Sequence, residues 1–413
     1  MSKQQAFTEE VQLQGHIIDS LLLPRAFELI MDRGGEFEIL TIHVGKRKDE
    51  TSLAKMRVTA PSAKVLTEIL DELQALGAEL MGAEDVETEP APRDGALPAD
   101  FYSTTNLPTE VRLGGEWVPV DGTEMDLAVV VDQAAGRACT RPMTRVRKGE
   151  AVAVRHNGIR VLPLERARGG EIFSFMNSAV SSEKPKKLVI REVAREMHAV
   201  HARGGKILLV AGPAILHSGA GPYLASLVRD GFVDVLFGGN AIAVHDVEAA
   251  LYGTSLGVNL DSGLPVEGGH RHHMRAINAI RTAGSLKEAV EQGVLTKGVM
   301  FEAISRGITM VLGGSVRDDG PLPDVLTDVI ETQERMREAL QGVELALMIS
   351  TMLHSIATGN LLPASVRTVA VDINPAVVTK LADRGSWQTV GLVTDAELFL
   401  RELVLSLEDT DTD

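Results

Sequence analysis

The second half of the chain repeats one pattern: a short apolar run, a few small or polar residues, and then a segment of helical period. From residue 188 onward, helical segments alternate with the strand-like runs KILLVAG, VDVLFGG, TMVLGGS, LALMIS, TVAVD and VGLVTD. Such alternation is typical of a doubly wound α/β domain with a parallel sheet. Aromatic residues make up only 4% of the chain, so the core is largely aliphatic, which suits a buried parallel sheet. We predict this domain for residues 186–413.

Two smaller units are expected before it. Residues 1–98 show a strand, an amphipathic helix, a hairpin with its turn near residues 46–51, and a second helix, an order that resembles half of a ferredoxin-like sandwich. Within this unit, residues 86–98 form a proline-rich acidic segment without periodicity, which we interpret as a connector. Residues 99–185 contain short β signals separated by glycines and predict a β-rich domain.

Composition excludes several classes of function. The net charge of -16 argues against nucleic acid or an anionic membrane surface as the partner. No apolar run approaches the roughly 20 residues that span a bilayer, and the first residues lack the apolar core of a secretory signal. The single cysteine, Cys139, excludes an intramolecular disulfide framework and a cysteine metal cage, so we expect a cytoplasmic protein. Cys139 has no visible activating partner and is interpreted as a buried, inert thiol.

Residues at the ends of the predicted strands share one character. They are small residues, hydroxyls, amides and acids at Ala211, Gly238, Gly313, Ser350, Asp372 and Thr394. In open α/β sheets the ligand lies beyond the carboxyl ends of the strands, where helices that begin at once offer unpaired N–H groups to phosphate. The repetition at six strand ends therefore predicts a nucleotide-binding site.

Asp372 is the acid expected to bind the cofactor. It ends the run TVAVD and could accept hydrogen bonds from the ribose hydroxyls of a nucleotide, although Asp-x-Asn-Pro is also good chemistry for a turn and for capping the next helix. A carboxylate there favours NAD over NADP, because it would repel a 2′-phosphate. No G-x-G-x-x-G follows a strand, and GAGP at Gly219 lacks the third glycine, so a departure from the usual dinucleotide fold is expected.

A second constellation lies in the glycine-rich segment 260–278. Its polar residues are Asp261, Glu267, His270, His272, His273 and Arg275. The spacing His-x-His-His matches neither H-E-x-x-H nor a cysteine-based site, so no metal is predicted. An amino-acid pocket, with an acid/base histidine and an arginine for a carboxylate, explains the residue types better. A surface loop that leads into a helix remains the alternative.

Four segments resemble a known family. GGNAIAVHD, GGSVRDDGPLPDV, STMLHSIATGN and VDINPAVVTKLADRGS are similar to the archaeal-type, NAD-dependent ornithine cyclodeaminases, a module also fused behind the arginine dihydrolase of cyanobacteria. The N-terminal part resembles the conserved region of lysine-ketoglutarate reductase/saccharopine dehydrogenase enzymes. The resemblance implies a C-terminal NAD-binding domain of deoxyhypusine-synthase type, which would account for the missing glycine fingerprint.

The same resemblance implies which residues contact NAD. They are Asn240, Ala241, Asp319, Thr351, Met352, Leu353, His354, Asp372 and Asp395. No family motif fixes the catalytic residues, so the residue types alone nominate Asp318, His270 and Arg275. Arg317 is a second candidate for binding the α-carboxylate, and Asp261 or Glu267 could replace Asp318 in binding the distal ammonium.

The implied reaction is conversion of L-ornithine to L-proline and ammonia with no net redox change, because hydride leaves Cα for NAD and later returns. Two alternatives stay open. One is another NAD-dependent oxidoreductase acting on saccharopine, lysine or a polyamine, and the other is a non-catalytic, NAD-responsive regulatory module. The expected partner is a small amino acid, and the β-rich insertion suggests a homo-oligomer.

Overall fold

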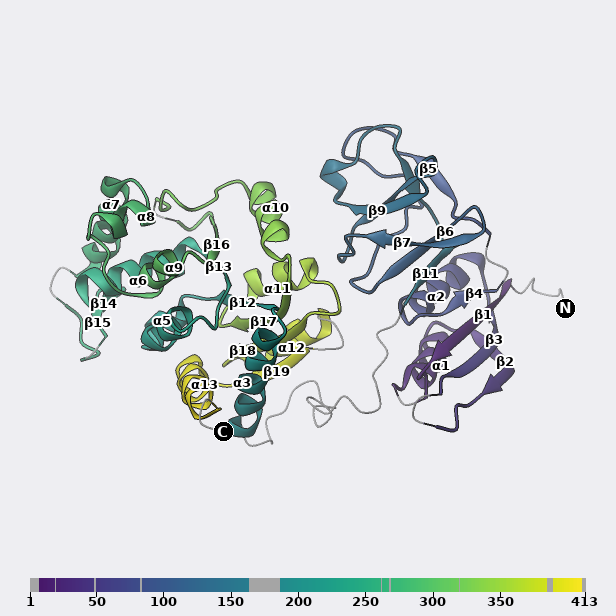
Figure 1. Cartoon of the computed structure of the whole chain (residues 1–413). Helices are drawn as coiled ribbons and strands as arrows, with labels where there is room; N and C mark the ends of the chain where they lie inside the picture. Colours follow the sequence, from purple (N-terminus) through teal and green to yellow (C-terminus); the bar gives the residue numbers. More distant parts are fainter. Residues whose placement is uncertain are drawn as a thin grey trace. The chain divides into compact units, whose positions relative to one another are not determined.

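The computed structural model describes residues 7–18, 20–47, 50–81, 84–162, 186–260, 262–266, 269–318, 320–384 and 389–410. The chain divides into two compact units, residues 1–173 and 174–413 (Figure 1). Among the described helices, none is both long enough and apolar enough to cross a membrane.

Unit 1 begins with a four-stranded antiparallel sheet covered by two helices. Its elements are β1 (Phe7–Gly15), α1 (Leu22–Asp32), β2 (Glu36–His43), β3 (Ser52–Ala60), α2 (Ala63–Ala75) and β4 (Glu79–Leu80). The strand order β2-β3-β1-β4 completes the ferredoxin-like β-α-β-β-α-β motif, of which the sequence indicated half. Ser62 begins α2 as its N-cap, since its hydroxyl accepts the N–H of Val65 at 3.3 Å.

The rest of unit 1 is a seven-stranded sheet, as the β-rich pattern predicts. Its elements are β5 (Thr88–Pro90), β6 (Thr109–Leu113), β7 (Glu116–Asp121), β8 (Ala128–Asp132), β9 (Arg137–Arg141), the 3-10 turn η1 (Met143–Arg145), β10 (Ala151–Ala153) and β11 (Ile159–Val161). They follow the order β11-β6-β7-β9-β8-β10-β5. The segment interpreted as a connector contains β5, which pairs with β10 at the sheet edge, where a proline is tolerated.

Unit 2 carries the predicted parallel sheet. Its first part comprises α3 (Lys186–Ala202), β12 (Lys206–Ala211), α4 (Ala214–His217), α5 (Gly221–Arg229), β13 (Val235–Gly239), α6 (Asn240–Tyr252), β14 (Thr254–Ser255), β15 (Val258–Asn259), η2 (Gly269–Arg271), α7 (His272–Ala283), α8 (Leu286–Glu291) and α9 (Val299–Arg306). Its second part comprises β16 (Thr309–Gly313), α10 (Val329–Ala339), β17 (Val343–Ile349), α11 (Met352–Leu361), β18 (Arg367–Asp372), α12 (Pro375–Arg384), β19 (Thr389–Val393) and α13 (Ala396–Thr410).

The strand order in unit 2 corrects one expectation. The six parallel strands follow the order β16-β13-β12-β17-β18-β19, which is 3-2-1-4-5-6 when counted along the chain. This is the usual Rossmann order, although the glycine fingerprint after the first strand is missing. Strand order depends on packing between distant segments, so it can be the usual one even where the local glycine motif is absent.

Helices cover both faces of this sheet. On the two sides of β12 the right-handed crossovers run in opposite directions, which places the helices that join β12, β13 and β16 on one face and those that join β17, β18 and β19 on the other. Accordingly α5 and α3 both contact α13, while α11 contacts α10 and α12 (Figure 1). The central strands β12 and β17 are almost wholly buried, with an aliphatic core as predicted.

Candidate functional site at the carboxyl edge of the parallel sheet

The strand order reverses between β12 and β17, the position at which Rossmann domains bind their ligand. The backbones following these two strands lie very close together. The N–H of Gly212 donates to the carbonyl of Ile349 at 2.9 Å, and a Cβ on Gly212 would overlap the carbonyl oxygen of Ser350. Ser350 itself has a φ of 53°, an unfavourable value for a residue with a side chain. This turn therefore requires glycine on one strand and accepts strain on the other.

Two helices begin at this edge without a side-chain cap. Asn240 is the first residue of α6, directly after β13, and Thr351 precedes α11 after β17; neither helix start has a side-chain cap hydrogen bond. The Asn240 side chain is 3% exposed and accepts the N–H of Leu322 at 3.0 Å, so it holds the loop that follows β16. The first N–H groups of α6 and α11 are thus left for a ligand or water.

His354 lies across the ends of two further strands. A Cβ on Gly239 or on Gly313 would come within 3.0 Å or 3.3 Å of its imidazole, so glycine at both positions makes room for the ring. Burial lowers the pKa of His354 and favours the neutral imidazole. Its neighbours Met352 and Leu353 are 44% and 74% exposed, unusual for large apolar side chains at a helix start.

The acids at the ends of β18 and β19 make local turns. Asp372 accepts the N–H of Asn374 at 2.8 Å through Oδ1, but Asn374, not Asp372, bonds the first turn of α12, through the N–H of Ala376. Asp372 is therefore not the cap of that helix, which was the alternative reading. Asp395 is exposed and does cap α13, by accepting the N–H of Glu397 at 2.8 Å.

The loop after β16 holds the predicted residues Arg317, Asp318 and Asp319. Asp318 is partly buried and accepts the N–H of Ser315 at 2.8 Å, so it closes a turn of this loop. Arg317 is exposed. Asp319 lies outside the described residues.

The histidine-rich segment is described only in part. Asp261, Glu267 and the side chain of His270 lie outside the described residues. His272 shares a 2.9 Å hydrogen bond with Thr254 and stacks on Tyr252. Arg275 is exposed on α7.

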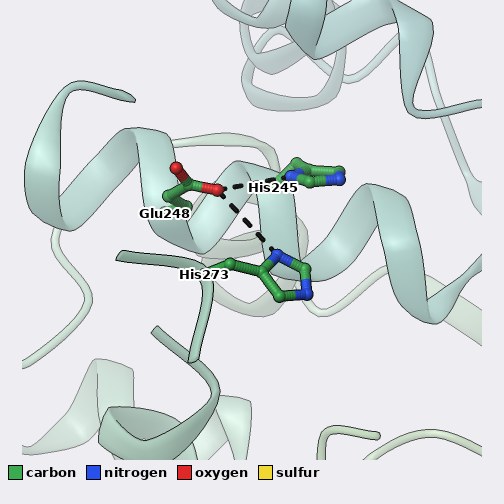
Figure 2. A group of neighbouring side chains, drawn as sticks. All are labelled: His245, Glu248 and His273. Carbon is green, nitrogen blue, oxygen red and sulfur yellow. Dashed lines mark hydrogen bonds and ion pairs between the residues drawn. The ribbon is translucent and has the colours of Figure 1, made fainter. Parts of the chain in front are cut away.

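Sequence reasoning missed the buried polar cluster around Glu248. Glu248 and His245 come from α6 and His273 from α7, and one possible ligand atom from each lies within 4.8 Å of the other two (Figure 2). His217, at the end of α4, lies beside His245 with ring centroids 4.6 Å apart. Such a spacing admits a metal ion as well as proton transfer. The available signal was the group His245, Asp246 and Glu248 within a helix whose other residues are mostly apolar.

The environment fixes the charges in this cluster. Burial opposes ionisation of Glu248, but hydrogen bonds from His245, Gly257, Thr254 and Leu256 outweigh it and lower the Glu248 pKa. His217 is partly exposed, and its partial burial and the neighbouring His245 lower its pKa. The cluster therefore combines a carboxylate with imidazoles that can accept protons.

Strand order, glycines at the switch point and uncapped helix starts place unit 2 in the class of dinucleotide-binding Rossmann domains. Three family models agree. Residues 191–403 match the arginine dihydrolase ArgZ-like, C-terminal, Rossmann fold family, residues 108–190 match the first region of the same C-terminal part, and residues 8–107 match the LOR/SDH bifunctional enzyme conserved region.

Relatives narrow the class to one family. The ornithine cyclodeaminase of Methanothermobacter thermautotrophicus is 54% identical over 394 residues, which cover 95% of this chain and 96% of that protein. The chain belongs to the ornithine cyclodeaminase family. Apo ArgZ, an arginine dihydrolase from cyanobacteria, superposes with a TM-score of 0.87 at 40% identity over 98% of this chain. AgrE in a ternary complex with ornithine and NAD+ is 43% identical over 100% of this chain, with a TM-score of 0.54. The chain spans 59% of each of these two longer polypeptides.

Proposed function

We propose that this protein converts L-ornithine to L-proline and ammonia with NAD as a bound hydride carrier. The observation that carries the proposal is the likeness, at 43% identity over the whole chain, to a protein solved with ornithine and NAD+ together. The Rossmann order of unit 2 and its uncapped helix starts supply a physical place for the cofactor.

Different residues along the carboxyl edge would bind different parts of NAD. The N–H groups at Asn240 and Ala241 and at Met352 would bond the pyrophosphate, since both helix starts lack a side-chain cap. The exposed side chains of Met352 and Leu353 would cover apolar parts of the cofactor. Asp372, with Oδ1 bonded to Asn374, would direct Oδ2 to the adenosine ribose. The resemblance adds Thr351, His354, Asp319 and Asp395.

The chain must also bind a diamino acid and exclude water from an imine. When bound, NAD takes hydride from Cα of ornithine and returns it to the same carbon. The δ-amino nitrogen attacks the imine carbon, and the α-nitrogen leaves as ammonia. Arg275 or Arg317 would bind the α-carboxylate, and both are exposed in the structure. Asp318 and His270 stay the proposed partners of the amino groups.

An isotope experiment tests the closed cycle. Ornithine carrying deuterium at Cα should give proline that retains the deuterium at C2, with catalytic NAD and no accumulated NADH. Mass spectrometry of the product and absorbance of NADH measure the two outcomes. If the label is lost, or if NADH rises in proportion to product, the protein is an ordinary amino-acid dehydrogenase. NAD binding without turnover on any amino acid would favour a regulatory module.

Cellular context and assembly complete the proposal. We infer a cytoplasmic enzyme, because the lone Cys139 is partly buried and no described cysteine partner exists for it. A homo-oligomer is proposed on the β-rich insertion alone, and the division into residues 1–98, 99–185 and 186–413 is proposed for three folding units. Sedimentation of the full chain measures the oligomeric state, and limited proteolysis tests the division into three folding units.

A further inference from the structure

Glu248 is a wholly buried carboxylate whose oxygens are held from several directions. Oε1 accepts the hydroxyl of Thr254 at 2.9 Å and the N–H of Gly257 at 3.1 Å, and Oε2 accepts the N–H of Leu256 at 3.3 Å. The side chain is 0% exposed. These contacts fix its position and balance the cost of burying its charge.

Two imidazoles face one oxygen of this carboxylate. Nδ1 of His245 lies 3.4 Å from Oε2, and Nδ1 of His273 lies 3.9 Å from the same atom (Figure 2). The ring centroids of the two histidines are 5.1 Å apart. In each ring Nδ1 is the nitrogen nearer the carboxylate, and Nε2 lies on the far side (Figure 2). The 3.4 Å hydrogen bond to His245 sets the tautomer of that ring and leaves its Nε2 as the proton acceptor, whereas at 3.9 Å the carboxylate acts on His273 through its charge.

The charges of this arrangement suit the transfer of one proton. One carboxylate stabilises the first proton that either imidazole accepts, while a second proton would place two imidazolium groups side by side. Among the described residues, His217 on α4 is the other ionisable group whose ring contacts the pair. His272 on α7 stacks on Tyr252 and shares a hydrogen bond with Thr254, whose hydroxyl donates to Glu248. Glu248 is the one carboxylate among these described neighbours.

The cluster lies on the elements that leave the carboxyl edge. α6 begins at the end of β13, and His245 is five residues farther on, about 8 Å along the helix axis. α4 follows β12, and the ring of His217 at its end contacts the ring of His245. α4 and α6 start where the cofactor is proposed to bind, so His217 and His245 lie within about two helical turns of that edge.

We propose that Glu248 positions His245 and His273 as the proton-transfer pair for the amine steps of the reaction. This inference rests on the proposed function. One Nε2 removes a proton from the δ-ammonium, and the freed lone pair forms the new bond to the imine carbon. The ring nitrogen formed in this way still carries two protons, so the pair takes one of them and gives it to the α-nitrogen, which leaves as ammonia while the lone pair of the ring nitrogen forms the cyclic iminium. The first proton passes to solvent, and the pair ends each turnover in its starting state.

The test compares two histidine–carboxylate pairs in unit 2. Glu248→Gln keeps the size and an acceptor for the surrounding donors but removes the charge. The matched control is Asp234→Asn, because Asp234 sits before β13 at the opposite edge, 3.3 Å from Nε2 of His201, and also accepts the backbone N–H of Ile207. Circular dichroism, melting temperature and NAD affinity check folding and cofactor binding in every variant.

We expect Glu248→Gln to lower kcat by about 100-fold while KM and NAD affinity change little. The acidic limb of its pH profile should move to lower pH, since the imidazolium form loses the negative charge that stabilises it. Asp234→Asn should leave kcat and the profile unchanged. If Glu248→Gln does not fold, His245→Asn carries the test, because its amide can replace Nδ1 but not Nε2.

Three results overturn the inference. If Glu248→Gln has a normal kcat and an unshifted pH profile, Glu248 has no part in the mechanism. Stoichiometric zinc in the purified wild type that is absent from Glu248→Gln would make the cluster a metal site instead. An equal loss in the Asp234→Asn control would reduce the effect to stability. Failure of the proposed function is distinct, because the wild type would then form no proline at all.

Discussion

The two ends of the carboxyl edge use acidic residues in opposite ways. On the β13 side, Asp246 and Glu248 are 2% and 0% exposed; Asp246 accepts hydrogen bonds from the distant residues Val299 and Met300, and Glu248 accepts them from the segment six to nine residues after it. On the β18–β19 side, Asp372 and Asp395 are partly or fully exposed and bond only N–H groups two or three residues away. Buried acids here are held by the fold and can serve chemistry. Exposed acids shape a turn and keep an oxygen for a ligand.

Removing the buried acid Asp246 should produce the largest effect. Its two oxygens accept the N–H groups of Val299 and Met300 at 2.9 Å and 2.7 Å, so it caps α9 from another helix. Asp246→Ala would leave both donors buried without partners and should lower the free energy of unfolding by about 3 kcal/mol. Asp328→Ala, which removes the exposed cap of α10, should cost only about 1 kcal/mol. Urea denaturation measures both.

The pH dependence of stability checks the same residue. Burial raises the pKa of Asp246 to about 6, above its ordinary value of 3.8. The folded state therefore binds this proton more tightly, and its contribution is present at low pH and lost as pH rises through about 6. The lowered pKa values of His217 and His354 act with opposite sign, so wild type must be compared with Asp246→Asn. A pH-independent difference between the two would contradict the assignment.

The comparison also shows what the sequence could reveal. Alternating apolar and helical runs predicted the parallel sheet, because that period is local, and strand ends such as Asn240 and Asp372 could be located from it. Strand order depends on contacts between distant segments, so the sequence pattern did not reveal it. The missing glycine motif led to the expectation of a departure from the usual dinucleotide fold, and the strand order did not agree with that expectation. The Glu248 cluster escaped because its members come from α4, α6 and α7, and spacing within one segment cannot show ligands or partners from another.

The next largest effect is expected for NAD affinity, at the exposed acid Asp372 on the β18–β19 side of the carboxyl edge. Asp372→Ala should weaken NAD binding at least about tenfold, because a charged acceptor for the ribose is lost, without changing the free energy of unfolding. Asp372→Asn retains an acceptor for the N–H of Asn374 and separates the turn from the ligand contact. Calorimetric titration with NAD measures both variants, and Asp328→Ala is the control. Unchanged affinity in Asp372→Ala would reduce this residue to a turn former.

The smallest expected effect is that of a chelator, and it tests the buried end of the edge. Oxygens of Glu248 already accept N–H and O–H groups of the surrounding chain, so its carboxylate is held by the fold without an ion. The segment His270 to His273 also lacks the spacing of a known metal motif. EDTA should therefore leave the rate of proline formation unchanged, with zinc-loaded EDTA as the control. Loss of turnover in EDTA alone, restored by zinc, would show that His245, Glu248 and His273 bind a metal ion and that the buried acids serve it rather than a proton.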